Sequence, residues 1–436
     1  MLATREYPIL DRLNTWVLLC PLLFVAVITT FSFEPSAQND ALSSVGGSMG
    51  GGGSASGSFA NQLKYALIWF IFVAILVPVY KQVIQLFIRN KLMLLLCFLP
   101  LLSTIWSQDP GKTARAGLSV VLSSAFAAYL SVKFTPARLI RLLMLLGWVA
   151  MIVSLFLAVF MPQYGLNHRS GSAGEWEGIF PGKNVCAMQL FFLLFPAIYM
   201  EPVNDLERIG RILYIGLALG EIAMTRSATA IIMLVALALF VIITRLVFKL
   251  RSRDSIPVAL IAGTTAIGIA ATAFQYRNVI FALVGKDPTL TGRTSIWGAI
   301  LVSVMKQPLL GYGYGSFWTS LTGESANVIL AIGWVMGYAH NGFLQILLDV
   351  GWLGLVLLLV VTAGTFRAAL KCFVSHRTAA VQWYIAVLCF VLLYNMDEAS
   401  LLSTFNLSWV MFLVCSFNLR ELAREPSTNT ELAVAA

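Results

Sequence analysis

The chain has 436 residues, of which 59% are hydrophobic and only 11% are charged, and its formal net charge is +9. Soluble domains carry about 25% charged residues, and the apolar residues of this chain form blocks close to the ~20 residues that span a bilayer. This composition excludes a soluble globular protein. It also argues against nucleic-acid binding, because the basic residues stand between the apolar blocks, where they indicate membrane topology.

Twelve apolar blocks predict membrane-spanning helices. In chain order they cover residues 14–33, 62–80, 92–106, 114–132, 139–161, 184–200, 209–224, 227–248, 256–275, 342–365, 380–395 and 400–419. The first block follows Arg5 and Arg12 and has no clear small-residue cleavage site, so it is expected to remain as an anchor. The residues therefore predict an all-α, multi-pass membrane protein that forms a single membrane domain over 1–436.

The segments between the blocks alternate in charge. If the N-terminus lies in the cytoplasm, the segments on the cytoplasmic side hold most of the 29 Lys and Arg residues, and each of these segments is basic. Positively charged loops stay on the cytoplasmic side of a membrane. The distribution predicts an even number of spans, about twelve, with both termini in the cytoplasm.

Two of the outside segments are long. Residues 34–61 are rich in Gly and Ser and predict a flexible linker. Residues 276–341 form one long loop with its own helical signal, in which Ile296 and Ile300 share a face and Pro308 follows the expected end. A helix of about ten residues is too short to span a bilayer, so it is expected to lie at the membrane interface.

The same loop contains the run Gly311-Tyr312-Gly313-Tyr314-Gly315. Alternating glycines let a backbone approach a ligand closely, beside the flat faces of the two tyrosine rings. Tyr312 and Tyr314 are therefore candidate substrate-binding residues. A tight turn with interfacial tyrosines explains the run equally well.

Two arginines and one histidine fall on the same predicted outside face. Arg226 lies in a short turn between two spans, Arg293 precedes the loop helix, and His340 opens the tenth span. A guanidinium binds phosphate through two parallel N–H groups, and an imidazole accepts a proton near neutral pH. Together they suggest group transfer from a diphosphate-linked donor to a hydroxyl. Taken singly, they fit an arginine that reaches to the interface, an arginine paired within its own loop, and a structural histidine.

The tenth span begins with a polar stripe. Asn341, Gln345 and Asp349 recur at four-residue spacing on one face of a helix. Asn341 is expected to support His340, whereas Gln345 and Asp349 are expected to tie this helix to neighbouring spans. A carboxylate about two turns inside an apolar helix is costly unless it faces the interior of the bundle or water.

Metal and cofactor chemistry is not expected. The six cysteines lie in or beside apolar blocks without CxxC spacing, and the three histidines, His168, His340 and His376, are scattered along the chain. No motif predicts a metal site or a cofactor.

Six short motifs then occur in the order in which one family carries them. They are Trp106-Ser107-Gln108-Asp109-Pro110, Gly178-Ile179-Phe180-Pro181-Gly182-Lys183-Asn184, Thr225-Arg226-Ser227-Ala228-Thr229, Thr291-Gly292-Arg293-Thr294, Pro308-Leu309-Leu310-Gly311-Tyr312-Gly313-Tyr314-Gly315-Ser316-Phe317 and His340-Asn341-Gly342-Phe343-Leu344. In these motifs, over about 103–360, the chain resembles the O-antigen ligase / Wzy polymerase superfamily of bacterial envelope polysaccharide enzymes. Within it, the chain is most similar to the ExoQ-type exopolysaccharide polymerisation proteins.

The resemblance implies a multi-pass protein of the bacterial inner membrane with about a dozen spans and a large periplasmic loop. It implies a metal-independent glycosyltransferase that polymerises undecaprenyl-diphosphate-linked oligosaccharide repeat units into exopolysaccharide on the periplasmic face. Donor and acceptor would both be lipid-linked and held at the bilayer. A chain-length regulator and export machinery are the protein partners that the resemblance suggests.

The resemblance also assigns roles to residues. Arg226 and Arg293 match the family's functional arginines, which would hold the diphosphate, and His340 matches the catalytic histidine, which would activate the acceptor hydroxyl. Many relatives have His-Lys-Asn where this chain has Gly182-Lys183-Asn184. The role of that histidine does not carry over, and Lys183 becomes a candidate anion ligand.

Glu221 and the pair Asp397-Glu398 are further candidates. Glu221 precedes the Arg226 turn, and the pair lies in the last outside segment. They are expected to orient the arginines or to meet sugar hydroxyls, although a solvated turn explains the pair at least as well.

Two alternative functions remain open at the level of sequence. A ligase would use nearly the same site to move finished glycan to another acceptor. A polysaccharide transporter or flippase would predict charged residues near the middle of several spans and symmetry between the two halves of the chain. Only Asp349 lies clearly inside a span, and the halves do not look alike.

Overall fold

The computed structural model describes residues 70–168, 173–180, 182–249, 293–318, 323–333, 336–404 and 406–425. Within these ranges the protein is all-helical and has no strand, and one isolated bridge joins Leu166 to Trp176. The predicted spans 14–33 and 256–275, and the linker 34–61, lie outside the described residues. The long loop 276–341 is described from Arg293 onward, apart from two gaps.

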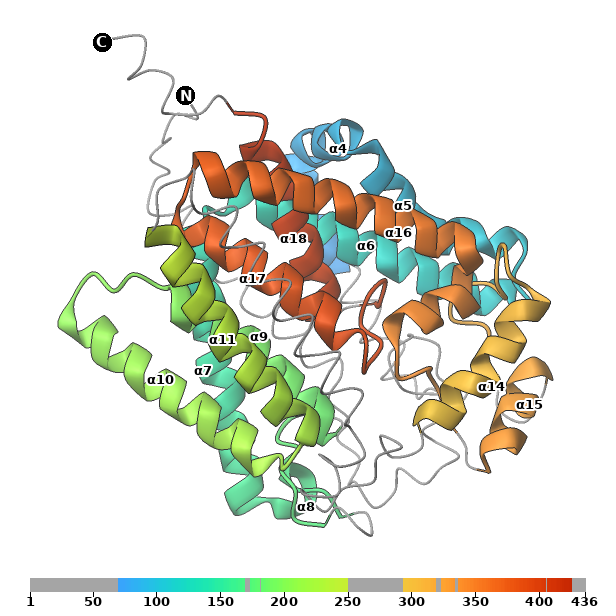
Figure 1. Cartoon of the computed structure of the whole chain (residues 1–436), viewed down its shortest axis with the longest axis horizontal. Helices are drawn as coiled ribbons and strands as arrows, with labels where there is room; N and C mark the ends of the chain where they lie inside the picture. Colours follow the sequence, from blue (N-terminus) through green and yellow to red (C-terminus); the bar gives the residue numbers. More distant parts are fainter. Residues whose placement is uncertain are drawn as a thin grey trace.

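Figure 1 shows the arrangement of the helices. They are α4 (Tyr80–Arg89), α5 (Lys91–Leu102), α6 (Pro110–Lys133), α7 (Pro136–Phe160), α8 (Pro162–Gly165), α9 (Lys183–Tyr199), α10 (Asp205–Met224), α11 (Ala228–Lys249), α14 (Arg293–Lys306), α15 (Gly323–Ile332), α16 (Gly342–Ser375), α17 (Ala379–Tyr394) and α18 (Leu407–Leu422).

Every predicted span inside the described ranges contains a helix. Four of the described helices are both long and apolar enough to cross a membrane: Phe70–Arg89, α6, α7 and α16. Others, such as α5, α9 and α17, are apolar but shorter. The all-α prediction is confirmed for the described part of the chain, whereas the count of twelve spans and their sidedness stay predictions.

Capping residues explain where several helices begin. Asp109 accepts the N–H of Lys112 at 3.0 Å and leaves Pro110 at the first position of α6. Thr135 and Pro136 begin α7 in the same way. The predicted loop helix is found as α14, and α15 is an additional short helix that no sequence pattern predicted.

The start of the last helix differs from the prediction. The sequence predicts the twelfth span from residue 400, whereas α18 begins at Leu407. The side chain of Asn395 holds the intervening loop, because its Oδ1 accepts the N–H groups of Ser400 and Leu401 at 2.8 and 2.9 Å. The same loop carries the adjacent carboxylates Asp397 and Glu398.

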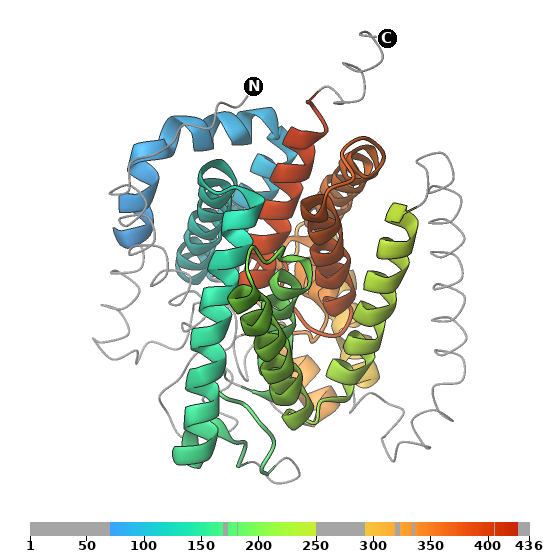
Figure 2. The ribbon, with the colours of Figure 1, turned by 90° about the vertical axis from the view of Figure 1, so that its left-hand side faces the viewer.

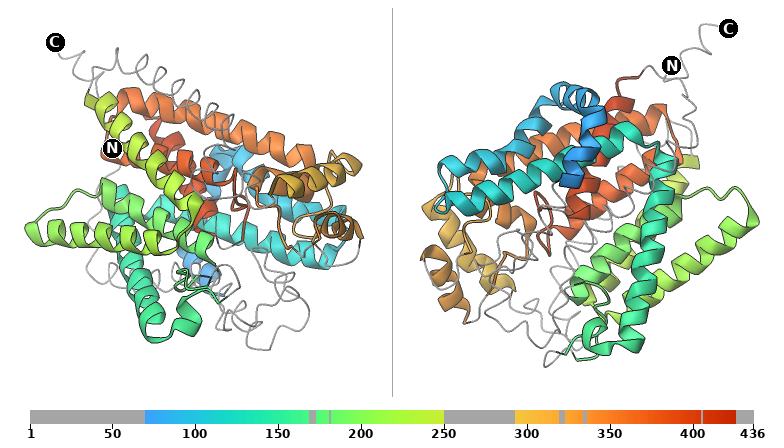
Figure 3. Two further views of the ribbon diagram at one scale, coloured as in Figure 1. Left: turned by 60° about the horizontal axis from the view of Figure 1, so that its bottom comes forward. Right: turned by 180° about the vertical axis from the view of Figure 1, so that it is seen from behind.

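Helix α18 lies in the middle of the bundle, where it packs against α6, α9, α16 and α17 (Figures 1 and 2). Its Trp409 is fully buried, and the indole Nε1 donates to Ser124 Oγ of α6 at 3.0 Å. Figure 3 shows the pair α14 and α15 on one side of this bundle and α10 on the other.

Helix α16 is two helices joined at a break. Gly351 has φ 65° and ψ −165°, which only glycine adopts readily, and an added Cβ would lie 2.3 Å from Leu309 O. The backbone groups freed by the break are paired with segment 308–313, as buried backbone at membrane depth requires. The bonds are Tyr312 N–H to Leu348 O (2.8 Å), Gly313 N–H to Asp349 O (3.0 Å), Trp352 N–H to Pro308 O (2.8 Å) and Leu353 N–H to Leu309 O (3.1 Å).

Asp349 is part of the same junction. Its Oδ1 accepts the backbone N–H of Gly315 and the side-chain amide of Gln345, both at 3.1 Å. Gln345 in turn accepts the Trp318 indole N–H at 3.2 Å. The polar stripe therefore fastens the segment after α14 to the first half of α16.

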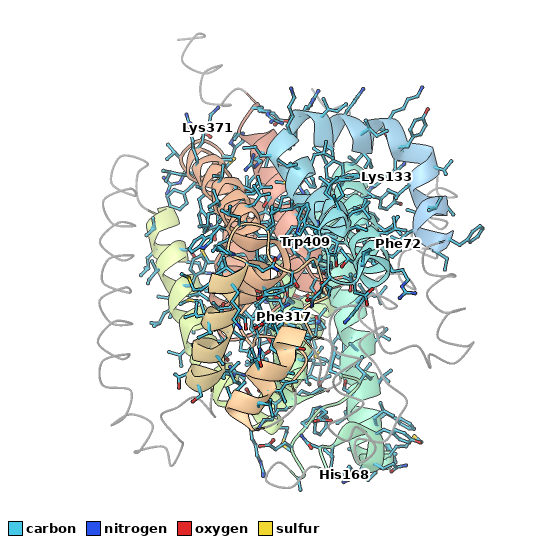
Figure 4. All side chains as sticks on the ribbon, turned by 90° about the vertical axis from the view of Figure 1, so that its right-hand side faces the viewer. Phe72, Lys133, His168, Phe317, Lys371 and Trp409 are labelled. Atoms are coloured by element: carbon cyan, nitrogen blue, oxygen red, sulfur yellow. The ribbon has the colours of Figure 1, made fainter. Side chains whose placement is uncertain are left out.

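The two ends of the bundle carry different residues. Figure 4 places Lys133 and Lys371, both predicted to be cytoplasmic, at one end and His168, predicted to be outside, at the other. The predicted topology requires this separation. We therefore call the His168 end the predicted periplasmic end.

Candidate active site

The buried carboxylate of Glu398 lies at the centre of the candidate site. It belongs to the loop between α17 and α18, and its side chain is 2% exposed. Its Oε1 accepts hydrogen bonds from Arg293 Nη2 at 2.9 Å and from Asn184 Nδ2 at 3.4 Å, and its Oε2 lies 3.3 Å from His340 Nδ1. Helix α14, helix α9 and the segment before α16 therefore meet at one side chain.

His340 is held through its neighbours. Ala339 donates its N–H to Gln345 Oε1 at 3.0 Å, and its carbonyl oxygen accepts a hydrogen bond from Trp297 Nε1 at 3.1 Å. The Tyr338 ring packs on the imidazole, with 4.0 Å between the ring centroids. His340 has a φ of 47°, a costly conformation for a residue other than glycine, and such strain clusters at functional sites.

The contact with Glu398 determines how the His340 ring can act. An ionised carboxylate only accepts hydrogen bonds, so Nδ1 carries the proton that it donates. In the neutral ring Nε2 is then an acceptor. A histidine in this arrangement can take a proton at Nε2, while the carboxylate stabilises the resulting positive charge.

Asn341 joins the start of α16 to the loop that carries Glu398. Its Oδ1 accepts the N–H groups of Phe343 and Leu344 at 3.0 and 3.1 Å, which caps the helix. Its Nδ2 donates to the carbonyl oxygen of Met396 at 3.0 Å. The residue after His340 thus fixes the histidine segment to the carboxylate loop.

Arg293 is the first residue of α14, and its side chain is 10% exposed. Its guanidinium bridges two adjacent carboxylates, with Nη1 on Asp397 and Nη2 on Glu398. Burial alone would lower the pKa of Arg293, but the charges of Glu398 and Asp397 outweigh burial and raise it. The carboxylate partners come from the loop after α17 and not from the loop of Arg293 itself.

The electrostatics of the cluster keep Glu398 ionised. Burial alone would raise the pKa of Glu398, but the hydrogen bond and charge of His340, followed by the charge of Arg293, outweigh burial and lower it. The pKa of the neighbouring Tyr338 phenol is shifted in the opposite direction. Burial and the charge of Glu398 raise the pKa of Tyr338 well above its ordinary value, so the phenol keeps its proton.

Arg226 lies in the turn between α10 and α11 and has a φ of 49°. Its side chain is exposed and forms no hydrogen bond or ion pair with the described residues. The next residue, Ser227, donates from Oγ to Asn184 Oδ1 at 3.0 Å, and Asn184 donates to Glu398. Two hydrogen bonds therefore connect the Arg226 turn to the carboxylate that contacts His340.

The remaining predicted residues have partners of their own. Lys183 Nζ lies 2.7 Å from Glu175 Oε2. Tyr312 and Tyr314 are buried, and each hydroxyl donates to a backbone carbonyl oxygen. The structure thus places the two tyrosine rings in the packing of their loop, and it places the lysine in an ion pair at the start of α9.

The sequence did not clearly predict three residues of the cluster. Glu398 was a weaker candidate than the arginines, and no individual role was predicted for Asn184 or Ser227, although both lie in motifs. Two adjacent carboxylates in the last outside segment were the available signal for Glu398. Its contact with Asn184 joins residues 214 positions apart, which no local pattern reveals.

Residues 213–359 match the O-antigen ligase family. The matched stretch contains Arg226, Arg293 and His340, the three residues for which the sequence predicted a joint site. The match covers about a third of the chain and makes these residues similar to an O-antigen ligase domain. The family resemblance inferred from the motifs is confirmed, and together with the apolar helices it identifies an integral membrane protein.

The chain is also similar to named proteins. The exopolysaccharide production protein ExoQ of Rhizobium meliloti (strain 1021) is 28% identical over 290 residues, which cover 63% of this chain and 64% of ExoQ. Two proteins named as candidate polysaccharide ligases are more distant. The one from Rickettsia prowazekii is 27% identical over 28% of this chain and 34% of its own length, and the one from Rickettsia typhi is 25% identical over 45% and 46%. The chain matches less than two thirds of the length of each relative.

Proposed function

We propose that this protein polymerises undecaprenyl-diphosphate-linked oligosaccharide repeat units into exopolysaccharide on the periplasmic face of the bacterial inner membrane. The observation that carries the proposal is the pairing of His340 with buried Glu398 beside Arg293. This arrangement is suited to removing a proton from a sugar hydroxyl close to a bound anion. The name of the relative ExoQ, an exopolysaccharide production protein, supports a polymer as the product.

In the proposed reaction His340 acts as the general base. Its Nε2 accepts the proton of an acceptor hydroxyl as the hydroxyl oxygen forms a bond to the anomeric carbon of the donor sugar. The bond between that carbon and the diphosphate oxygen breaks, and the diphosphate leaves with the electron pair. Glu398 holds the ring in place and stabilises the imidazolium until the proton passes to the departing diphosphate or to water. The balanced products are the extended glycan and the free lipid diphosphate.

The two arginines have different parts in this scheme. Arg226 is exposed and has no partner among the described residues, so its planar fork is available for the diphosphate. Arg293 is already shared by Asp397 and Glu398. It balances their charge and adds N–H groups at the edge of the same site, where negative charge develops on the leaving group. Lys183 carries its charge at the start of α9, where Glu175 compensates it.

A ligase is the second candidate function. The family description and the names of the two Rickettsia relatives favour it, because all three refer to ligases. The same base and arginines serve both reactions, and only the acceptor differs. A polymerase adds glycan to a lipid-linked repeat, whereas a ligase transfers it to a different molecule.

The test is the reaction of the purified protein with a defined undecaprenyl-diphosphate-linked repeat unit, followed by sizing of the products. A ladder of repeats on the lipid carrier is expected, and it should persist in EDTA because no metal takes part. A product that forms only when a different acceptor is supplied would favour the ligase.

His340→Ala is expected to abolish the ladder, because the general base is lost, while protein level and membrane insertion stay normal. His168→Ala is the matched control, since His168 is an exposed histidine of the predicted periplasmic end outside the cluster. A full ladder from the His340 variant would show that the general-base assignment is wrong.

A further inference from the structure

A second polar site lies at the opposite ends of the helices that carry the candidate active site. A pocket of ≈ 270 Å³ is lined by Tyr199, Glu201, Arg211, Arg245 and Gln382 and by the apolar end of α9. These residues come from the last turns of α9 and α11, from the second turn of α10 and from the first turn of α17, or directly adjoin them. The 17 residues of α9 separate the two sites by about 25 Å.

The two arginines are held in place by the last carbonyl groups of α9. Arg211 donates from Nη1 to Met200 O at 3.0 Å, and Arg245 donates from Nη2 to Ile198 O at 3.2 Å. Basic side chains often satisfy the carbonyls at a helix C-terminus in this way. Each bond uses one of the five N–H groups of a guanidinium, so most of the donors are left for another partner.

Two polar groups of the pocket wall are buried. Arg211 Nε has no hydrogen-bond partner among the described residues, and the hydroxyl of Tyr199, a residue only 5% exposed, lies beside Thr244. Buried donors without a partner are rare in native proteins, and both groups are able to donate to an anion.

The charge and surroundings of the pocket favour one class of ligand. The pocket lining is net positive, since it holds two guanidinium groups and the carboxylate of Glu201, which is exposed and pairs with neither arginine. The helix that supplies Arg211 also exposes Leu206, Ile209 and Ile212. A cationic pocket beside an exposed apolar surface suits a charged head group with acyl chains.

We propose that this pocket binds the phosphate of an anionic phospholipid head group. The guanidinium groups of Arg211 and Arg245 and the hydroxyl of Tyr199 are the donors to the phosphate. Basic pockets between membrane helices on the cytoplasmic side bind such head groups, and this is the predicted cytoplasmic end of the bundle. Because α10 and α11 also hold the Arg226 turn at their other ends, the lipid clamps two helices that frame the candidate active site.

The experiment is native mass spectrometry of the full chain purified in detergent and titrated with phosphatidylglycerol, phosphatidylethanolamine or soluble glycerol phosphate. Phosphatidylglycerol is expected to bind at one saturable site, at least about tenfold more tightly than either other compound. The double variant R211Q/R245Q is expected to lose at least about tenfold in affinity for phosphatidylglycerol, and Tyr199→Phe is expected to lose less. The Tyr199 variant removes a single hydroxyl, so it tests the site even if the double variant fails to fold.

The matched control is R138Q/R208Q, which removes two exposed arginines from the same end of the bundle and leaves the pocket intact. Equal losses in the two double variants would overturn the site, because the effect would then come from surface charge alone. Tighter binding of glycerol phosphate than of phosphatidylglycerol would overturn the lipid as the source of the phosphate. No saturable binding of either anion would overturn the proposal altogether.

Discussion

Side chains from α14, α9 and the segment before α16 all contact the carboxylate of Glu398. Replacing this one residue therefore tests the candidate site. A buried carboxylate persists only where neighbouring groups compensate it, and here His340 and Arg293 do so on its two oxygens. Because Glu398 contacts Nδ1 of His340, Nε2 is the ring nitrogen that is left to accept a proton. Glu398 is thus a positioning residue, because it acts through the histidine.

Glu398→Gln is expected to lower kcat by about two orders of magnitude with little change in KM, because the imidazolium loses its stabilising charge while substrate contacts remain. Initial rates of repeat transfer by the purified variant measure both constants. The control is Asp397→Asn, which removes the adjacent carboxylate on Arg293 and leaves the contact between Glu398 and the imidazole in place. Equal effects of the two substitutions on kcat would contradict the positioning role.

Arg226 differs from Arg293 in having no partner among the described residues. Arg226→Lys is expected to reduce kcat/KM at least about tenfold, because a point charge does not reproduce the planar fork of a guanidinium. Stability should change by less than about 0.5 kcal/mol, as for other exposed substitutions.

Steady-state rates and thermal unfolding of the same Arg226→Lys preparation provide both measurements. Arg208→Lys is the control, since it makes the same substitution at an exposed position of the opposite end. Near-normal activity of the Arg226 variant would instead favour a side chain that only reaches to the interface.

At the scale of elements, the break in α16 determines how the segment after α14 is held. The four backbone bonds between 308–313 and 348–353 replace bonds that an unbroken helix would make within itself. Asp349 adds a side-chain bond to the same segment. An acidic side chain has a structural explanation here, because the carboxyl oxygens accept hydrogen bonds from two donors at once.

Gly351→Ala is expected to destabilise the protein by about 2 kcal/mol or more, because alanine is strained at positive φ and its Cβ would meet the backbone of Leu309. Gly216→Ala is the matched control within α10, where an added Cβ meets open space. It should be neutral or stabilising by up to about 1 kcal/mol. Thermal unfolding of the two variants in the same detergent measures the difference, and equal unfolding temperatures would contradict the account of the break.

At the scale of the whole molecule, the candidate site forms where ends of helices from distant parts of the chain come together. The start of α9, the turn after α10, the start of α14, the segment before α16 and the loop after α17 all contribute. The proposed lipid pocket uses other ends of α9, α10, α11 and α17. Two polar sites at opposite ends of one apolar bundle are the arrangement expected of a protein that works across a bilayer.

Single cysteines test the predicted sidedness. His168→Cys should react with a membrane-impermeant maleimide in intact spheroplasts, whereas Lys133→Cys should react only after the membrane is opened, because the two positions lie at opposite ends of the bundle (Figure 4). Labelling is measured by the mass or fluorescence of the purified protein. The parent chain is the control, since four of the five cysteines in the described part are buried. The reverse pattern would invert the topology.

Local sequence patterns were sufficient to predict the positions of most helices and part of the candidate site. Runs of apolar residues predicted where helices lie, because a bilayer-spanning segment must be apolar over its whole length. The start of α18 was not predictable in this way, since the bonds of Asn395 and not hydropathy determine it. The motifs singled out Arg226, Arg293 and His340 because each motif is local.

The sequence by itself determined that this is a helical membrane protein, that it resembles the O-antigen ligase family, and that a histidine and two arginines stand in outside segments. The tertiary structure alone decided that Glu398 joins His340 to Arg293 and that Asn184 connects it to the Arg226 turn. It also decided that Tyr312 and Tyr314 pack inward. The physical reason is that these contacts depend on how helix ends meet in the bundle, whereas hydropathy and motifs report only on residues that are neighbours in the chain.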